Sequence, residues 1–310
     1  MIRPAGWIAH ASSTFLPIQI DPTWPIMNAP VPLSRALCLV IMGTAGLGSG
    51  CAALPGTSQT ATAAGGQNCA VAGRGAPVVV FEGGIGEKLD TWDKVYPQVQ
   101  VLTTVFAYTR RGYPGGGPTP AERDGALAVE NLRTLLSARG QRSPYVLVGH
   151  SLGGLYAELF TKLHPDEVAG VVLVDPTPVD HLERLRTEFP AKYALLRTLM
   201  SLQAGSIATI EQRGVDATSR EWHAAGPFPK CPMIVLTGIK ASVLEDEAMI
   251  AYKLRAHAQL LQQWPGSEGR QIECGHFIQR DKPEAVVTAV RDIVSRMAAK
   301  NPVLRPDVSR

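Results

Sequence analysis

Residues 144–164 read PYVLVGHSLGGLYAELFTKLH, and this stretch decides the fold. An apolar run, Tyr145–Val148, enters a glycine-rich turn, and a segment with helical spacing follows over Leu152–His164. Glycines lack a Cβ atom, so those beside Ser151 let a strand and a helix approach closely around a sharp turn. The G-x-S-x-G pattern in this setting is typical of a serine whose hydroxyl is raised above the sheet, facing the positive end of a helix dipole.

The rest of the chain repeats the alternation of strand and helix. Further apolar runs, rich in valine and without strict alternation, are typical of strands covered on both faces: Pro77–Phe81, Thr103–Tyr108, Val168–Val174, Pro232–Thr237 and Arg270–Cys274. Helical spacing marks Ala121–Arg139 and Pro283–Ala298. We therefore predict an α/β fold with a mostly parallel central sheet flanked by helices. Residues 179–230 hold only helical or irregular patterns, which predicts a small inserted helical cap or, alternatively, an enlarged crossover.

Composition narrows the class of protein. Among 310 residues, 45% are apolar and 18% are charged, which excludes a wholly disordered chain. A net charge of +3 gives no support for nucleic-acid binding, which usually needs a concentrated basic surface. The sequence has no P-loop, no G-x-G-x-x-G and no cysteine or histidine cluster with zinc spacing. We expect no cofactor, no metal and no required disulfide.

The front of the chain differs from the rest. Met27 opens a segment in which Arg35 precedes an apolar stretch, 36–48, and small residues then lead to Cys51. This pattern resembles a bacterial lipoprotein signal with Cys51 as the lipidated residue, although Leu47 stands four residues before the cysteine instead of three. A plain secretory signal is the close alternative, and a buried helix of the fold is the third interpretation. We expect residues 1–50 to hold upstream residues and an export signal, and the protein to be periplasmic or anchored to a membrane.

Composition also suggests where the folded domain lies. Residues 51–70 are rich in Ala, Thr, Gly, Ser and Gln, which is typical of a flexible tether. We expect the folded domain over residues 71–300, with the cap at about 179–230, and a C-terminal tail over 301–310.

A serine hydroxyl is a weak nucleophile unless a base removes its proton. His276 is the candidate base, because it follows the last expected strand and can reach over the sheet edge to Ser151. The other histidines considered lie in the turn, on helices or in the cap, where a structural role is commoner: His150, His164, His181, His223 and His257.

Five motifs together resemble the α/β-hydrolase superfamily, in particular small serine hydrolases with catalytic residues in the order Ser, Asp, His. The motifs are FEGGIG (81–86), YTRRGYPGGG (108–117), PYVLVGHSLGG (144–154), VVLVDP (171–176) and CGHFIQRDKPE (274–284). The resemblance covers about residues 75–300. It departs from many relatives at Glu82-Gly83, where the loop often begins His-Gly.

Of the three expected catalytic residues, the acid is the one that the sequence determines least. In many relatives it follows the strand before the last, but residues 239–242 after Gly238 contain no acid. Asp175, at the carboxyl end of the expected strand over 168–174, is the preferred candidate because some members of the superfamily use that position. Asp246 and Glu245 are the alternatives, and they would need a longer loop to reach His276.

The resemblance implies an oxyanion hole made of two backbone N–H groups. By position these are Gly84, with Ile85 as the neighbouring candidate, and Leu152, which follows the serine. Arg110 and Arg111 either touch an acidic substrate or, as is commoner, anchor loops.

The expected activity is hydrolysis of small carboxylic esters through an acyl-enzyme. Amide, peptide or lactone hydrolysis is the alternative, and a non-catalytic binding protein on the same fold is the rival class. We expect a membrane tether through Cys51 and no nucleic-acid partner. The sequence leaves the oligomeric state open.

Overall fold

The computed structural model describes Leu54, Thr57–Thr60 and residues 66–300, apart from positions 122, 203–204 and 243–244. The chain divides into two units, Met1–Ala45 and Gly46–Arg310, and every described residue belongs to the second. The expected export segment with Met27 and Cys51, and the expected C-terminal tail, lie outside the described residues. Among the helices that are described, none has the length and apolar character needed to cross a membrane.

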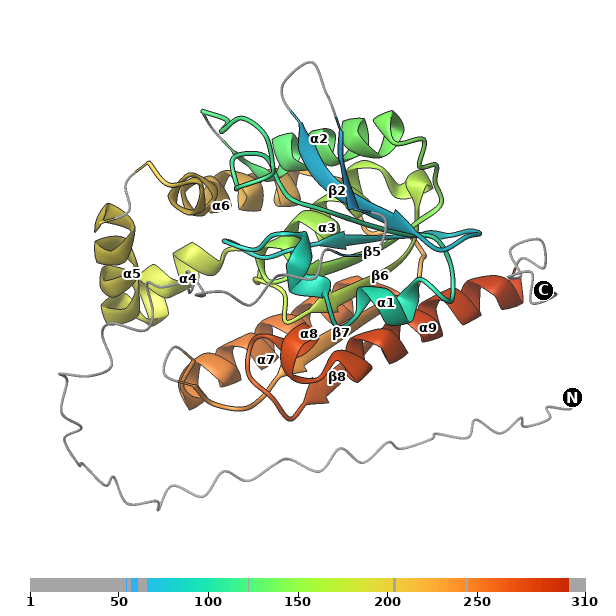
Figure 1. Cartoon of the computed structure of the whole chain (residues 1–310). Helices are drawn as coiled ribbons and strands as arrows, with labels where there is room; N and C mark the ends of the chain where they lie inside the picture. Colours follow the sequence, from blue (N-terminus) through green and yellow to red (C-terminus); the bar gives the residue numbers. More distant parts are fainter. Residues whose placement is uncertain are drawn as a thin grey trace, which may run out of the picture. The chain divides into compact units, whose positions relative to one another are not determined.

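A single sheet of eight strands organises the described residues, in the order β1-β2-β4-β3-β5-β6-β7-β8 (Figure 1). The strands are β1 (Thr57–Thr60), β2 (Gln67–Ala72), β3 (Val78–Glu82), β4 (Val105–Tyr108), β5 (Tyr145–His150), β6 (Val168–Val174), β7 (Met233–Gly238) and β8 (Ser267–Ile272). β1 and β2 pair antiparallel with their neighbours, and all other pairs are parallel. The predicted α/β class is therefore confirmed, and the carboxyl ends of the parallel strands meet at one edge.

Helices cover both faces of this sheet; Figure 1 shows the green α2 on one side and the red α9 on the other. One buried cluster joins the sheet to α2 (Gly125–Ala138), α3 (Leu152–Leu163) and α7 (Glu247–Gln263). The other joins it to η1 (Leu89–Trp92), α1 (Tyr96–Val99), α8 (Ile278–Asp281) and α9 (Pro283–Lys300). A short turn, η2 (Pro165–Glu167), leads from α3 to β6.

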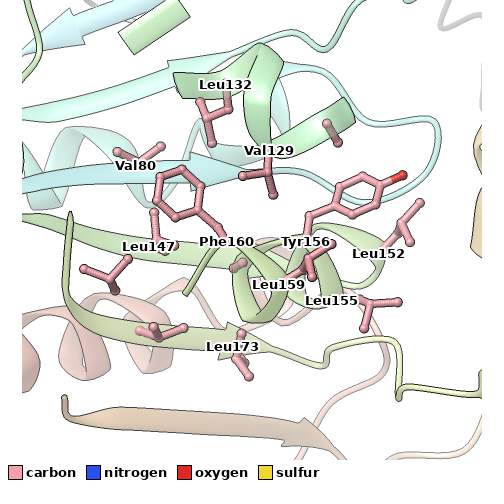
Figure 2. Close-up of a cluster of buried hydrophobic side chains, with 14 of the residues drawn as sticks. Val80, Val129, Leu132, Leu147, Leu152, Leu155, Tyr156, Leu159, Phe160 and Leu173 are labelled. Carbon is pink, nitrogen blue, oxygen red and sulfur yellow. The ribbon is translucent and has the colours of Figure 1, made fainter. Parts of the chain in front are cut away.

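The two-sided cover explains why the strands lack alternation. In β3, Val80 faces the cluster with α2 and α3, whereas its neighbours Val79 and Phe81 face the opposite cluster. Both faces of the strand are buried, so both sets of positions are apolar. Figure 2 shows the first cluster, in which three strands meet α2 and α3 through Val80, Leu147, Leu173, Val129, Leu132, Leu155, Leu159 and Phe160.

Two expectations about the strands are wrong. Residues 51–70 were expected to be a tether, but β1 and the first part of β2 lie there and extend the sheet beyond β4. β1 reads TSQT, and its backbone pairing with β2 needs no apolar side chains, so hydropathy gives no signal. The last strand covers Ser267–Ile272 instead of Arg270–Cys274, because an edge strand with partly exposed side chains has no continuous apolar run.

Between β6 and β7 the described residues form three helices, α4 (His181–Glu188), α5 (Pro190–Leu202) and α6 (Ile207–Ala224). A hydrogen bond fastens α6 to the core: Trp222 Nε1 donates to Glu158 Oε2 of α3 over 2.9 Å. The Lys162 ammonium lies 3.7 Å from the centre of the Trp222 ring. Burial raises the pKa of Glu158 to about 8, although the Trp222 hydrogen bond and the Lys162 charge act in the opposite direction.

The raised pKa of Glu158 predicts a pH-dependent stability. The folded-state pKa of about 8 exceeds the unfolded value of about 4.3, so the free energy of unfolding falls as pH rises between these values. Glu158→Gln keeps an acceptor for Trp222 and has no charge to bury. We expect the variant to be about 1–3 kcal/mol more stable than wild type at pH 8, and the difference to shrink at pH 5, in urea denaturation.

Glu247→Gln, at an exposed position, is the matched control and should follow the wild-type pH dependence. Equal slopes for wild type and Glu158→Gln between pH 5 and 8 would contradict the assignment.

Candidate active site

Ser151 lies in the turn between β5 and α3 with φ of 52° and ψ of −123°. A positive φ costs a non-glycine residue about 1–3 kcal/mol and persists only where the surroundings enforce it. Here the Ser151 N–H donates to the Val174 carbonyl over 3.1 Å, and its own carbonyl accepts from the N–H groups of Gly154 and Thr177, each over 2.9 Å. The serine is therefore held at the carboxyl edge by the end of β6 and the loop after it.

The glycines of this turn are required by close packing. A Cβ atom on Gly149 would lie 2.4 Å from the Gly153 carbonyl oxygen, and one on Gly153 would lie 2.4 Å from the Gly83 carbonyl oxygen. Both distances are far below van der Waals contact. The strand, the helix and the loop after β3 can thus meet around Ser151 only without side chains at these positions.

Asp175 and His276 form a close pair at the same edge. Asp175 directly follows β6, is fully buried, and its Oδ2 accepts from His276 Nδ1 over 2.6 Å. Its Oδ1 accepts from the Gly238 N–H over 3.0 Å. Burial raises the pKa of Asp175, but the His276 hydrogen bond and the nearby positive charges outweigh burial and hold it well below its usual range. The contact requires a proton on Nδ1, so Nε2 of a neutral His276 is left as the acceptor.

The loop carrying His276 lies against the turn carrying Ser151. His150, the residue before the serine, has its Nε2 3.1 Å from the His276 carbonyl oxygen, and the two imidazole centroids are 4.6 Å apart. Among the described side chains, the group within hydrogen-bond distance of Ser151 Oγ is Thr177 Oγ1, at 3.5 Å. The hydrogen bond between a catalytic serine and its base is often long in a site without substrate and tightens when substrate binds.

The alternative acids are placed differently. Asp246 caps α7 by accepting from the Met249 N–H over 3.0 Å, and it pairs with Lys192 at 2.8 Å while 58% of its side chain is exposed. It is not brought to His276. Glu245 is closer, with Oε1 3.9 Å from His276 Nδ1. The geometry therefore favours Asp175 over both alternatives.

Lys253 of α7 was not identified from the sequence. Its ammonium lies 2.6 Å from Asp175 Oδ2 and 2.8 Å from Glu245 Oε2, and the residue is buried. The contacting side-chain atoms of Asp175, Glu245 and His276 lie within 4.8 Å of one another, and the Lys253 ammonium pairs with both carboxylates. A lysine at helical spacing with buried Met249 is the signal that could have identified it.

The loop after β3 lies against Ser151, since a Cβ atom on Gly84 would be 3.0 Å from Ser151 Cβ. The Gly84 N–H, however, donates to Glu87 Oε2 over 2.7 Å. The N–H groups of Ile85 and Leu152 donate to no acceptor among the described residues. Of the two candidates in this loop, Ile85 therefore has the available donor.

Glu87 links this loop to the turn. Its Oε2 also lies 2.7 Å from His150 Nδ1, and its Oε1 accepts from Thr91 Oγ1 over 2.7 Å and from Arg280 Nη2 over 2.9 Å. Burial raises the pKa of Glu87, but His150, the Gly84 N–H and the Thr91 hydroxyl reverse the shift and hold the pKa well below its usual range. Glu87 is thus an ionised, buried acceptor that fixes His150 and the loop together.

A second buried network fixes the carbonyls of the loop. Arg110 donates to the carbonyl oxygens of Gly83 and Gly84, and it pairs with Glu82 Oε1 at 2.7 Å. Its Nε donates to Glu211 Oε1 of α6 over 2.7 Å. Arg110 therefore anchors the loop, which confirms one of the two interpretations of the sequence, and Glu82, the last residue of β3, is its partner. Arg123 and Tyr113 also donate to Glu211, which ties α6 to this loop.

Comparisons with known proteins agree with this architecture. The sequence model described as "Alpha/beta hydrolase family" matches residues 79–289. The protein YqjL of Bacillus subtilis (strain 168) is 25% identical over 222 residues, covering 71% of this chain and 85% of YqjL. Esterase Rv0045c of Mycobacterium tuberculosis is 26% identical over 258 residues, covering 72% of this chain and 84% of the esterase. The crystal structure of ALR0039 from Nostoc sp PCC 7120 superposes with a TM-score of 0.59 at 20% identity, covering 77% of this chain and 97% of ALR0039.

Removing Arg110 tests the buried network. Arg110→Met leaves Glu82 and Glu211 buried without their main cation, so we expect a loss of about 3–5 kcal/mol in the free energy of unfolding. Urea denaturation measures the loss. Arg111→Met, at the adjacent and partly exposed position, is the control and should change stability by less than about 0.5 kcal/mol. Equal effects of the two substitutions would show that the network does not hold the loop.

Proposed function

The chain belongs to the alpha/beta hydrolase family, and from this premise we propose that it is a serine hydrolase that cleaves carboxylic esters. The observation that carries the proposal is the 2.6 Å contact between His276 Nδ1 and Asp175 Oδ2. Ser151, whose positive φ is enforced by its surroundings, donates its N–H to Val174, the residue before Asp175, and its neighbour His150 contacts the His276 carbonyl. A nucleophile, a base and a buried acid that orients the base are the parts that acyl transfer needs.

In the proposed reaction, His276 Nε2 takes the proton of Ser151 as Oγ attacks the ester carbonyl carbon. Asp175 holds the imidazole in the required tautomer and stabilises the imidazolium that forms. His276 then gives the proton to the leaving alcohol, and an acyl group stays on Ser151. Water attacks the acyl-enzyme while His276 takes its proton, and the carboxylic acid leaves as Ser151 regains its hydrogen.

The N–H groups of Leu152 and Ile85 are the proposed donors to the tetrahedral oxyanion, each contributing about 3–4 kcal/mol to the transition state. Gly84, the residue expected by position, has its N–H engaged by Glu87. Its role in the proposal is to allow the loop to approach Ser151 without a side chain.

We propose esters as the substrate class because the Mycobacterium tuberculosis relative is an esterase. Amides, peptides and lactones use the same chemistry and are the alternative substrates. The buried acid of α6, Glu211, is paired with Arg110 and Arg123, so it is not available to hold a substrate amine.

Export and lipidation at Cys51 remain part of the proposal on the sequence pattern alone, and loss of membrane association in a Cys51→Ser variant is their test.

Paired substitutions of the candidate acids test the mechanism. Asp175→Asn removes the charge that orients and stabilises His276, so kcat on a p-nitrophenyl ester should fall about 10³–10⁴-fold. Asp246→Asn changes an exposed helix cap and should alter kcat by less than about threefold. A steady-state assay of both variants beside wild type and Ser151→Ala measures these effects.

Near-full turnover in Asp175→Asn would contradict the assignment of the acid. No hydrolysis by wild type above the Ser151→Ala background, over a series of ester, amide and lactone substrates, would contradict the proposed function and favour a binding protein.

A further inference from the structure

One carboxylate oxygen at the edge of the sheet serves two donors. Oδ2 of Asp175 accepts from His276 Nδ1 over 2.6 Å and from Lys253 Nζ over 2.6 Å. The Lys253 side chain is only 5% exposed and that of Asp175 is fully buried. A buried ammonium is costly unless it is paired and hydrogen-bonded, so Lys253 is specifically accommodated at this position.

Glu245 completes the arrangement. Its Oε2 lies 2.8 Å from the Lys253 ammonium, and its Oε1 lies 3.9 Å from His276 Nδ1. Lys253 and Glu245 therefore place one positive and one negative charge beside the His276 imidazole. Lys253 acts on the imidazole through Asp175, and Glu245 offsets the charge of Lys253.

We propose that Lys253 and Glu245 form a positioning pair, which holds the Asp175 carboxylate against His276 and sets the pH at which His276 acts as a base. The inference rests on the proposed function and adds two residues to its machinery. Lys253 contacts the orienting acid Asp175, and Glu245 lies near Nδ1 of His276, away from its acceptor nitrogen Nε2, so both are positioning residues.

The charges around His276 determine the direction of the effect. Burial lowers the pKa of His276, but the hydrogen bond and charge of Asp175 and the charge of Glu245 raise it above its ordinary value, and Lys253 opposes the rise. Groups facing His276 come from several elements: Asp175 after β6, Glu245 before α7, Lys253 on α7, His181 on α4, and His150 on β5 with its partner Glu87. Burial lowers the pKa of His181 to about 4, so His181 is neutral at neutral pH.

The two substitutions shift the pKa of His276 in opposite directions. Without the Lys253 charge, the two carboxylates stabilise the imidazolium more strongly, so the pKa of His276 rises and a neutral base appears only at higher pH. Without the Glu245 charge, the opposite shift occurs. Removing both charges cancels the two shifts, because the pair is neutral as a whole.

The experiment measures the rate constant for labelling of Ser151 by an alkyl fluorophosphonate as a function of pH, which needs no knowledge of the natural substrate. For Lys253→Met we expect the midpoint of the acid limb to rise by about one pH unit, together with a lower plateau. For Glu245→Gln we expect the midpoint to fall by a similar amount, about one unit. For the double variant we expect a midpoint within about 0.3 units of wild type.

Arg255→Met is the matched control, because it removes a positive charge from the same helix at a side chain that is 62% exposed and 3.4 Å from Glu188. Solvent screens this charge, so the midpoint should not move. If Lys253→Met does not fold, the downward shift in Glu245→Gln decides alone.

Midpoints that stay at the wild-type value in the folded single variants, with Ser151 labelled normally, would overturn this inference and leave the proposed function intact. Failure of wild type to be labelled at Ser151 at any pH would overturn the proposed function and, with it, this inference.

Discussion

Ser151 occupies a backbone conformation with φ of 52°, and the carboxyl edge of the sheet is built around it. The conformation persists because Ser151 is hydrogen-bonded to the end of β6 and to the loop that follows. The same stretch of chain carries Asp175, which also has a positive φ, of 44°. The strained turn and the buried acid are therefore fixed by one set of backbone contacts between β5 and β6, and His276 needs only to reach the acid from the loop after β8.

Two buried networks hold the loop after β3 against this turn. Arg110 binds two carbonyl oxygens of the loop and connects them to Glu211 of α6. Glu87 accepts from the Gly84 N–H and pairs with His150. Because buried charges are stable only when fully paired, the loop, the turn and the helices above the sheet form one electrostatically coupled unit. In this arrangement the N–H of Ile85, in the loop, and the N–H of Leu152, which follows Ser151, donate to no acceptor among the described residues.

The sequence predicted those parts of the fold and site that depend on local pattern. Valine-rich runs marked the buried strands, and the glycine spacing marked the turn at Ser151. Asp175 and His276 follow strands whose carboxyl ends meet in a parallel sheet, so their proximity followed from topology. Lys253 and Glu211 could not be found in the same way, since their partners lie far away in the sequence and depend on helix rotation. β1 was not predicted because backbone pairing at an edge of the sheet needs little apolar surface. β2 lies between β1 and β4, and its short sequence, QNCAVA, mixes polar and small residues.

The most direct test of acyl transfer by Ser151 is mass spectrometry of the protein quenched with acid during turnover of p-nitrophenyl acetate. An acyl-enzyme mechanism predicts a single acetyl group on the peptide that contains Ser151. It predicts no acetylated peptide in the Ser151→Ala variant. Hydrolysis without any acetylated peptide, or an adduct on another residue that persists in Ser151→Ala, would contradict it.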